Sequence, residues 1–186
     1  MIKTKTILGI SFAAAFVFSM VLIPAYAGGH VFIDKTDVKL KDFKISKVDI
    51  KVTAKIPKDG GGGAFGYGIF TTDGFDNVLA LTTHPGILDH SSQGGDASNP
   101  VFHAHVLDLI AATGCATGFD AGKVDVPSSM ANAGFDADYK VKVKDKKISV
   151  SKITPGEIGV GITSIVAFLI DDSTGDLCLK IISSQP

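Results

Sequence analysis

Residues 47–56 read KVDIKVTAKI, ten residues in which polar and apolar side chains alternate without a break. Successive side chains of a β-strand point to opposite faces, so this period of two predicts a strand with one buried face and one solvated face. The same alternation returns in residues 139–144 and 147–153, which are joined at Asp145-Lys146 as a predicted hairpin. Antiparallel strands are therefore expected to dominate the fold.

Other apolar, β-branched or aromatic runs follow along the chain, and clusters of Gly, Pro, Asp and Ser separate them as turns. No stretch beyond residue 27 has a convincing helical period. Seven to nine strands of this kind predict an all-β fold, either an antiparallel immunoglobulin-like sandwich or a Greek-key barrel. The further runs are residues 65–72, 77–83, 101–111, 158–170 and 177–182.

The first 27 residues have the organisation of a secretory signal peptide. Two lysines precede an uncharged, mostly apolar run over residues 7–23, and residues 24–27 (PAYA) end in the small-x-small pattern that signal peptidase cleaves. Cleavage after Ala27 would leave residues 28–186 as a single secreted β-sandwich domain, in an extracellular, periplasmic or cell-surface location. The alternative is an uncleaved membrane anchor, because the apolar run is only slightly shorter than the roughly 20 residues that span a bilayer.

No second apolar run of spanning length follows, so the mature domain is not expected to be embedded in a membrane. Its two cysteines, Cys115 and Cys178, would then meet an oxidising environment, where they most simply form one disulfide. The alternatives are a pair of buried free thiols or one metal-ligating cysteine.

The charge pattern argues against a nucleic-acid partner. All 18 basic residues are lysine, so the chain lacks the planar guanidinium fork that favours bidentate recognition of phosphate and guanine. The formal net charge is −1, and loss of Lys3 and Lys5 with the leader makes it −3. A negative chain without arginine is a poor ligand for a phosphate backbone.

Histidine is concentrated in one part of the sequence. Four of the five histidines lie between residues 84 and 105, and imidazole is the commonest protein ligand of zinc and copper. In a strand, His103 and His105 would point to the same face, about 6.5 to 7 Å apart at their Cα atoms, and could close on one ion. His84 and His90 flank the loop that leads into this strand, and are expected to complete a set of three or four nitrogen ligands.

The alternative is that His103 and His105 only form hydrogen bonds within the sheet, and that His84 and His90 are ordinary loop residues. Asp89 and Asp108 are candidates for ligating the ion or for orienting an imidazole.

A second candidate site lies at the predicted mature N-terminus. A free Gly28-Gly29-His30 terminus can surround Cu(II) or Ni(II) with the α-amine, two deprotonated backbone amides and the imidazole, which gives the square plane of nitrogens that these ions favour. Cleavage after Gly29 would instead expose His30 as a terminal chelate of amine and imidazole.

Two family resemblances accompany these motifs. Residues 102–105 (FHAH), the Gly114-Cys115 pair, and residues 165–172 (IVAFLIDD) before Leu177-Cys178 resemble the pattern of copper/zinc superoxide dismutases. Residues 63–70 (GAFGYGIF), followed by Asp73-Gly74 and the His-x-His, are similar to extracellular CHRD-type domains. The first resemblance implies a superoxide-dismutase-like Greek-key fold, copper ligation by the two histidines of the FHAH motif, and a disulfide from the following loop to the last strand.

The same comparison argues against dismutase activity. The family carries further histidine ligands downstream and an arginine that guides the anion, whereas this chain has no histidine after His105 and no arginine. We therefore expect a secreted protein that binds, buffers or delivers copper or zinc. The alternative is a structural or adhesive sandwich with incidental histidines that contacts other cell-envelope proteins. A dismutase-like enzyme is the third interpretation.

Overall fold

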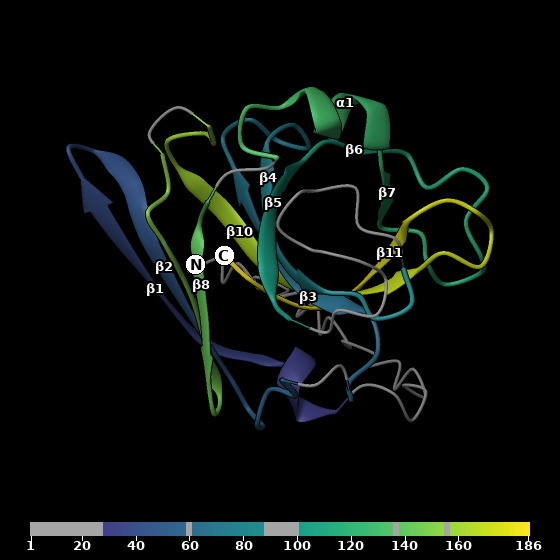
Figure 1. Ribbon diagram of the computed structural model, residues 1–186, viewed down its shortest axis with the longest axis horizontal. Coiled ribbons are helices and arrows are strands. Elements are labelled where there is room, and N and C mark those ends of the chain that lie inside the picture. The colour runs from purple at the N-terminus through teal and green to yellow at the C-terminus, as the bar shows by residue number, and fades with distance from the viewer. Residues whose placement is uncertain (1–27, 59–60, 88–100, 136–137, 155–156) are drawn as a thin grey trace, which may run out of the picture.

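The computed structural model describes residues 28–58, 61–87, 101–135, 138–154 and 157–186, and within these ranges the protein is an all-β structure with antiparallel pairing throughout (Figure 1). The predicted fold class is confirmed. A short 3-10 helix η1 (Gly29–Val31) and one helix α1 (Val126–Ala131) accompany the strands, which are β1 (Ile33–Lys41), β2 (Lys44–Val52), β3 (Phe65–Thr71), β4 (Val78–Thr83), β5 (His103–Leu107), β6 (Leu109–Ile110), β7 (Gly122–Val124), β8 (Lys140–Lys144), β9 (Lys147–Ser151), β10 (Ile162–Asp171) and β11 (Cys178–Gln185).

The number of strands exceeds the expected seven to nine, for two reasons. Most of β1 is exposed, and its polar residues do not alternate cleanly with apolar ones, so this segment shows no period of two. The run 101–111 is split at Asp108 into β5 and β6, and the three-residue strand β7 is too short to show a pattern. The predicted hairpin at Asp145-Lys146 is confirmed by the pairing of β8 with β9.

Seven strands form a sheet that curls into a nearly closed barrel. Their order is β5-β4-β3-β10-β11-β7-β6, so β5 and β6 lie at opposite ends of the sheet although only Asp108 separates them along the chain. The chain can run directly from one end to the other only if the sheet curls round on itself (Figure 1). The inner face of this barrel buries its own apolar cluster, which includes Leu107, Phe168 and Leu179.

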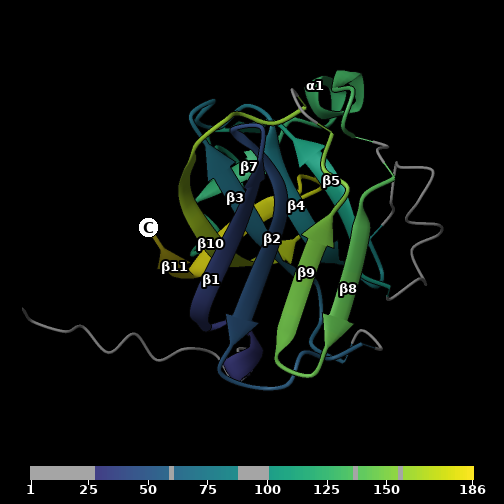
Figure 2. The same cartoon turned by 90° about the vertical axis from the view of Figure 1, so that its left-hand side faces the viewer.

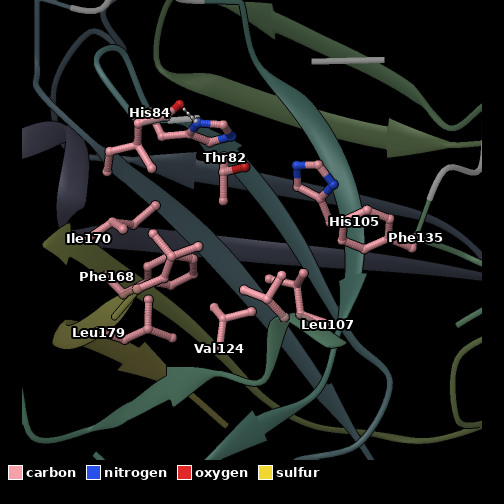
Figure 3. A pocket seen from close by; sticks show the side chains of 12 residues that line it. Thr82, His84, His105, Leu107, Val124, Phe135, Phe168, Ile170 and Leu179 are labelled. Carbon is pink, nitrogen blue, oxygen red and sulfur yellow. Dashed lines mark hydrogen bonds between the residues drawn. The ribbon is translucent and has the colours of Figure 1, made fainter. Parts of the chain in front are cut away.

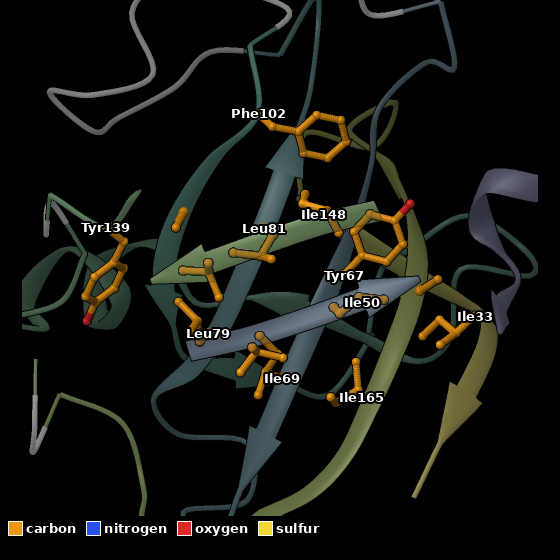
Figure 4. Close-up of a cluster of buried hydrophobic side chains, with 14 of the residues drawn as sticks. Ile33, Ile50, Tyr67, Ile69, Leu79, Leu81, Phe102, Tyr139, Ile148 and Ile165 are labelled. Atoms are coloured by element: carbon orange, nitrogen blue, oxygen red, sulfur yellow. The ribbon is translucent and has the colours of Figure 1, made fainter. Parts of the chain in front are cut away.

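Four strands, in the order β1-β2-β9-β8, form a second sheet that packs on the outside of the barrel (Figure 2). The alternation of residues 47–56 corresponds to a strand with one buried face, as predicted, but only as far as Val52, where β2 ends. Val48 and Ile50 are fully buried, and they lie opposite Val150 and Ile148 of β9. These side chains join Tyr67, Ile69 and Leu81 of the barrel in the main core, drawn in Figure 4.

The two cysteines form the predicted disulfide. Cys115 and Cys178 are bonded, with their Cα atoms 5.7 Å apart, across a sequence separation of 63 residues. In the chain-entropy model a loop of this length contributes about 4 kcal/mol to the free energy of unfolding. The bond ties the segment between β6 and β7 to the start of β11.

The described residues contain no helix with the length and apolar character needed to cross a membrane. The predicted signal peptide, residues 1–27, lies outside the described part of the chain.

Candidate metal centre

Two of the predicted ligands lie on β5, on the face that lines the barrel interior. His103 and His105 are two residues apart, so the strand points them to the same side, while Ala104 and Val106 face the main core. Only 7% of His103 and 5% of His105 is exposed. The prediction that both imidazoles share one face is confirmed, and they share it with Leu107.

His84 reaches the same place through a turn that its own sequence dictates. Residues 84–87 read His-Pro-Gly-Ile, and the Ile87 N–H donates to the His84 carbonyl oxygen at 3.0 Å. Proline sets φ at the second position of such a turn, and Gly86 adopts the positive φ of 88° that the third position of a type II turn requires. The turn directs the Ile87 carbonyl back to His84, whose Nδ1 lies 3.2 Å from the Ile87 oxygen.

The three imidazoles converge. One nitrogen from each of His84, His103 and His105 can be chosen so that all three lie within 4.8 Å of one another. The Nε2 atoms of His84 and His103 are 2.9 Å apart. Two imidazole nitrogens that bind one zinc or copper ion at about 2.0 Å lie about 2.8 to 3.3 Å apart for bond angles of about 90° to 109°. The cluster could therefore hold a metal ion.

The hydrogen bonds to backbone carbonyls indicate which nitrogen of His84 and of His103 carries the proton. His103 Nδ1 lies 2.9 Å from the Val101 carbonyl oxygen, as His84 Nδ1 does at 3.2 Å from that of Ile87. A carbonyl oxygen can only accept, so Nδ1 is the donor in both rings. In the neutral rings both Nε2 lone pairs then face each other, and they repel unless a proton or a metal ion lies between them. Backbone carbonyls of this kind orient the histidine ligands of metal sites.

The Thr82 hydroxyl, which was not predicted from the sequence, also lies beside the three histidines. Thr82 is 3% exposed, and its buried Oγ1 has no hydrogen-bond partner among the residues that the structure describes. It lies opposite His103 in the pairing of β4 with β5, and Figure 3 shows it between His84 and His105. The signal was present in the sequence, because Thr82 precedes His84 by two residues and so shares its face of the strand.

The cluster borders a small cavity inside the barrel. Its volume is about 60 Å³, enough for a few water molecules, and Thr82, His84 and His105 are its polar wall. The rest of the lining is apolar and includes Phe168 and Leu179 (Figure 3). The His105 ring also packs against Phe135, with ring centroids 5.3 Å apart. Of the three imidazoles, His84 is the most exposed, with intermediate burial, whereas His103 and His105 are buried.

The remaining candidate ligands have other positions. His90 and Asp89 lie outside the described residues, so ligation by His90 stays a prediction. Asp108 does not face the cluster as a free carboxylate, because its Oδ1 accepts hydrogen bonds from the Asn77 N–H and from Asn132 Nδ2. Its function here is to tie together loops at the end of the barrel.

His30 is separate from the three clustered histidines. It lies in η1, is 7% exposed, and packs against Phe65 with ring centroids 4.6 Å apart. Burial lowers the pKa of its imidazole. Copper chelation by Gly28, Gly29 and His30 stays a prediction.

No protein-family model, curated protein or solved structure matches the chain. The resemblances to superoxide dismutases and CHRD-type domains therefore remain predictions from short motifs.

Proposed function

We propose that residues 28–186 form a single exported domain, released from the signal peptide 1–27, that binds one copper or zinc ion through His84, His103 and His105. The observation that carries the proposal is the pair of facing Nε2 atoms, 2.9 Å apart, on two rings whose Nδ1 atoms face backbone carbonyls. A metal ion between these atoms removes the repulsion of their lone pairs. The third imidazole is within reach of the same ion.

The surroundings suit binding and controlled release of the ion. Three imidazoles leave one coordination position of a tetrahedral ion open, and the cavity beside Thr82 could hold a water molecule or a small ligand in that position. Two of the three rings project from a paired strand, which holds them in place before metal arrives. We therefore propose that the protein buffers or delivers the ion.

The test is a calorimetric titration of metal-free protein with Zn(II), and separately with copper, followed by metal analysis of the dialysed product. We expect one zinc per chain, lost in the double variant His103→Ala, His105→Ala. His30→Ala is the matched control, because it removes a buried histidine outside the cluster and should keep one zinc per chain. Circular dichroism of the metal-free variants checks that both remain folded.

Thermal unfolding gives an independent measure of the same binding. At a free zinc concentration about 100 times the Kd, the free energy of unfolding should rise by about 2.7 kcal/mol in wild type and not in the double variant. Equal zinc content in wild type and in the double variant would overturn the proposal. Wild type that binds neither zinc nor copper would also do so, and would favour the structural or adhesive interpretation.

A further inference from the structure

The outward side of the four-stranded sheet is covered with lysine. The ten lysines of β1, β2, β8 and β9 all project from this side, because each pairs in register with a residue that faces away from the main core. We call this surface the lysine face; Figure 2 looks onto it. Nine of the ten lysines are exposed and Lys47 is partly buried.

The lysines form rows across the strands. One row runs from Lys35 through Lys51 and Lys147 to Lys144, with like charges directly opposite one another at each step. A second row contains Lys39 and Lys47, and Lys140 lies at its far end beyond Ser151. Neighbouring strands are about 4.8 Å apart, so the lysine stems stand side by side on one face of the sheet.

Few negative charges interrupt this surface. The four strands contain three aspartates, of which Asp49 is 8% exposed and lies beneath Lys47 and Lys147, at 2.9 and 2.8 Å. Asp34 pairs with Lys51 at 2.8 Å. These strands therefore carry a formal charge of +7, whereas the other residues of 28–186, with six lysines and 16 acidic residues, carry −10. The net charge of −3 conceals two regions of opposite sign.

An exposed aromatic side chain stands at one end of the lysine face. Phe43 lies at the tip of the β1–β2 hairpin, between Lys41 and Lys44, and it is 92% exposed. Asp42 and Phe43 have φ of 52° and 63°, the left-handed conformation that a two-residue hairpin turn needs and that favours Asn and Gly. A Phe is an unfavourable choice for that turn, and its ring contributes almost nothing to the core.

Neither the rows of lysines nor the exposed Phe43 is explained by a contribution to folding stability. Like charges directly opposite in a sheet are destabilising, and so is a bulky residue at positive φ. Lysines gathered on one sheet face beside an exposed aromatic ring are complementary to the surface of an anionic bilayer. Lysine near such a surface is attracted to lipid phosphates, and an apolar ring can enter the headgroup region. Lysine serves here as a point charge, for which the arginine fork is not needed.

We propose that the lysine face and Phe43 dock the protein peripherally on an anionic lipid bilayer, with the barrel and its histidine cluster directed away from the membrane. The inference is independent of metal binding. It requires no spanning segment, since the lysines contact the lipid phosphates from the aqueous side and only the hairpin tip enters the headgroup layer.

Co-sedimentation with vesicles tests the electrostatic part. We expect the purified protein to bind vesicles of phosphatidylglycerol mixed with phosphatidylcholine, and to bind phosphatidylcholine vesicles much more weakly. Neutral vesicles also measure any contribution of the apolar run 7–23, which all variants share. The variant K140Q/K142Q/K144Q removes three exposed lysines of β8 and should weaken binding to the anionic vesicles about a hundredfold, since each lysine near the surface contributes about fivefold.

The matched control is K58Q/K152Q/K180Q, which changes net charge by the same amount at positions outside the lysine face. It should bind the anionic vesicles as wild type does. Equal loss of binding in the two triple variants would show that net charge alone is responsible, and would overturn the proposal. So would equal binding of wild type to anionic and neutral vesicles.

The chain contains no tryptophan, so Phe43→Trp introduces a single fluorescent reporter at the hairpin tip. Its emission should shift to the blue on anionic vesicles and return on addition of concentrated salt, while Phe43→Ser should bind more weakly than wild type. An emission maximum that anionic vesicles leave unchanged would contradict insertion of the tip. Binding to soluble polyanions such as heparin without binding to vesicles would assign the lysine face to an acidic polymer and overturn the bilayer proposal.

Discussion

Asp49 is the acidic residue on which the lysine face depends most. Its burial opposes ionisation, but hydrogen bonds from Lys147, Ser149 and Lys47 outweigh this effect and lower its pKa from 3.8 to about 2. A carboxyl whose pKa falls on folding stabilises the folded state at pH values above its unfolded pKa, and the contribution is lost as pH falls through the folded pKa.

Asp49→Asn should therefore lower the free energy of unfolding by about 2 kcal/mol at neutral pH. The difference from wild type should shrink as pH falls from about 4 to about 2, where the wild-type carboxyl also becomes neutral. Urea unfolding of both proteins at several pH values measures this. Asp37→Asn is a suitable control, because Asp37 lies opposite Asp49 but is exposed. A difference that persists unchanged at pH 2 would mean that Asp49 stabilises through packing and not through charge.

Substitution of Thr82 should affect the metal-free protein and the metal-bound protein differently. Its hydroxyl is buried without a partner in the described part of the chain, and such a group costs about 1 to 3 kcal/mol. Thr82→Val removes the hydroxyl at nearly constant volume, so the metal-free protein should be as stable as wild type or more stable. Zinc affinity should fall about tenfold, as it does when groups that support metal ligands are removed. Calorimetry with zinc and thermal unfolding without it give the two readouts.

The control for this substitution is Thr83→Val on the same strand. Thr83 is also fully buried, but successive residues of a strand face opposite sides, so it points away from the histidine cluster. The zinc affinity of Thr83→Val should equal that of wild type. If Thr82→Val left zinc affinity unchanged, the hydroxyl would have no function in the metal site.

At the scale of elements, glycine in β3 sets how closely β4 can lie beside it in the barrel. A Cβ at Gly66 would lie 2.7 Å from the Leu81 carbonyl oxygen and 2.8 Å from Thr82 Cγ2, closer than real Cβ contacts. Gly66→Ala must push β4 outward, and we expect it to destabilise the protein by about 1 to 3 kcal/mol and to weaken zinc binding by moving Thr82 and His84.

Gly68→Ala provides the comparison on the same face of the same strand. A Cβ at Gly68 meets only side-chain atoms, at 3.3 to 3.4 Å, so small adjustments can accommodate it. Its free energy of unfolding should stay within about 1 kcal/mol of wild type. Denaturant unfolding and zinc calorimetry of the two variants measure the contrast, and equal effects at Gly66 and Gly68 would contradict the argument from close approach.

The sequence predicted elements wherever one face is buried and the other wet. Alternation in residues 47–52 and 140–151 identified β2, β8 and β9, and the His-x-His spacing correctly placed two imidazoles on one face. It did not identify β1, whose inner face is largely exposed, so its apolar positions carry no clear period. The approach of His84 depends on a turn and on the pairing of β4 with β5, which are non-local and leave no periodic signal.

At the scale of the whole molecule, the separation of charge should control how stability depends on salt. Five cross-strand pairs on the lysine face place lysine opposite lysine, and the remainder of residues 28–186 has a surplus of acidic residues. The like charges within each region repel one another. Added salt screens like-charge pairs about 5 Å apart once the Debye length falls toward that distance.

Raising NaCl from about 0.02 M to about 0.5 M should therefore increase the free energy of unfolding by about 1 to 2 kcal/mol, since each like-charge pair costs a few tenths of a kcal/mol. Lys35 and Lys39 lie opposite Lys51 and Lys47, so the variant K35Q/K39Q removes two of these pairs. It should be more stable than wild type at low salt and should respond less to NaCl, whereas K55Q/K152Q, outside the lysine face, should keep the wild-type response. Denaturant unfolding at each salt concentration measures these slopes. Stability that falls with salt in wild type would show that attraction between the two regions outweighs the repulsion within each, and that the lysine rows are tolerated without cost.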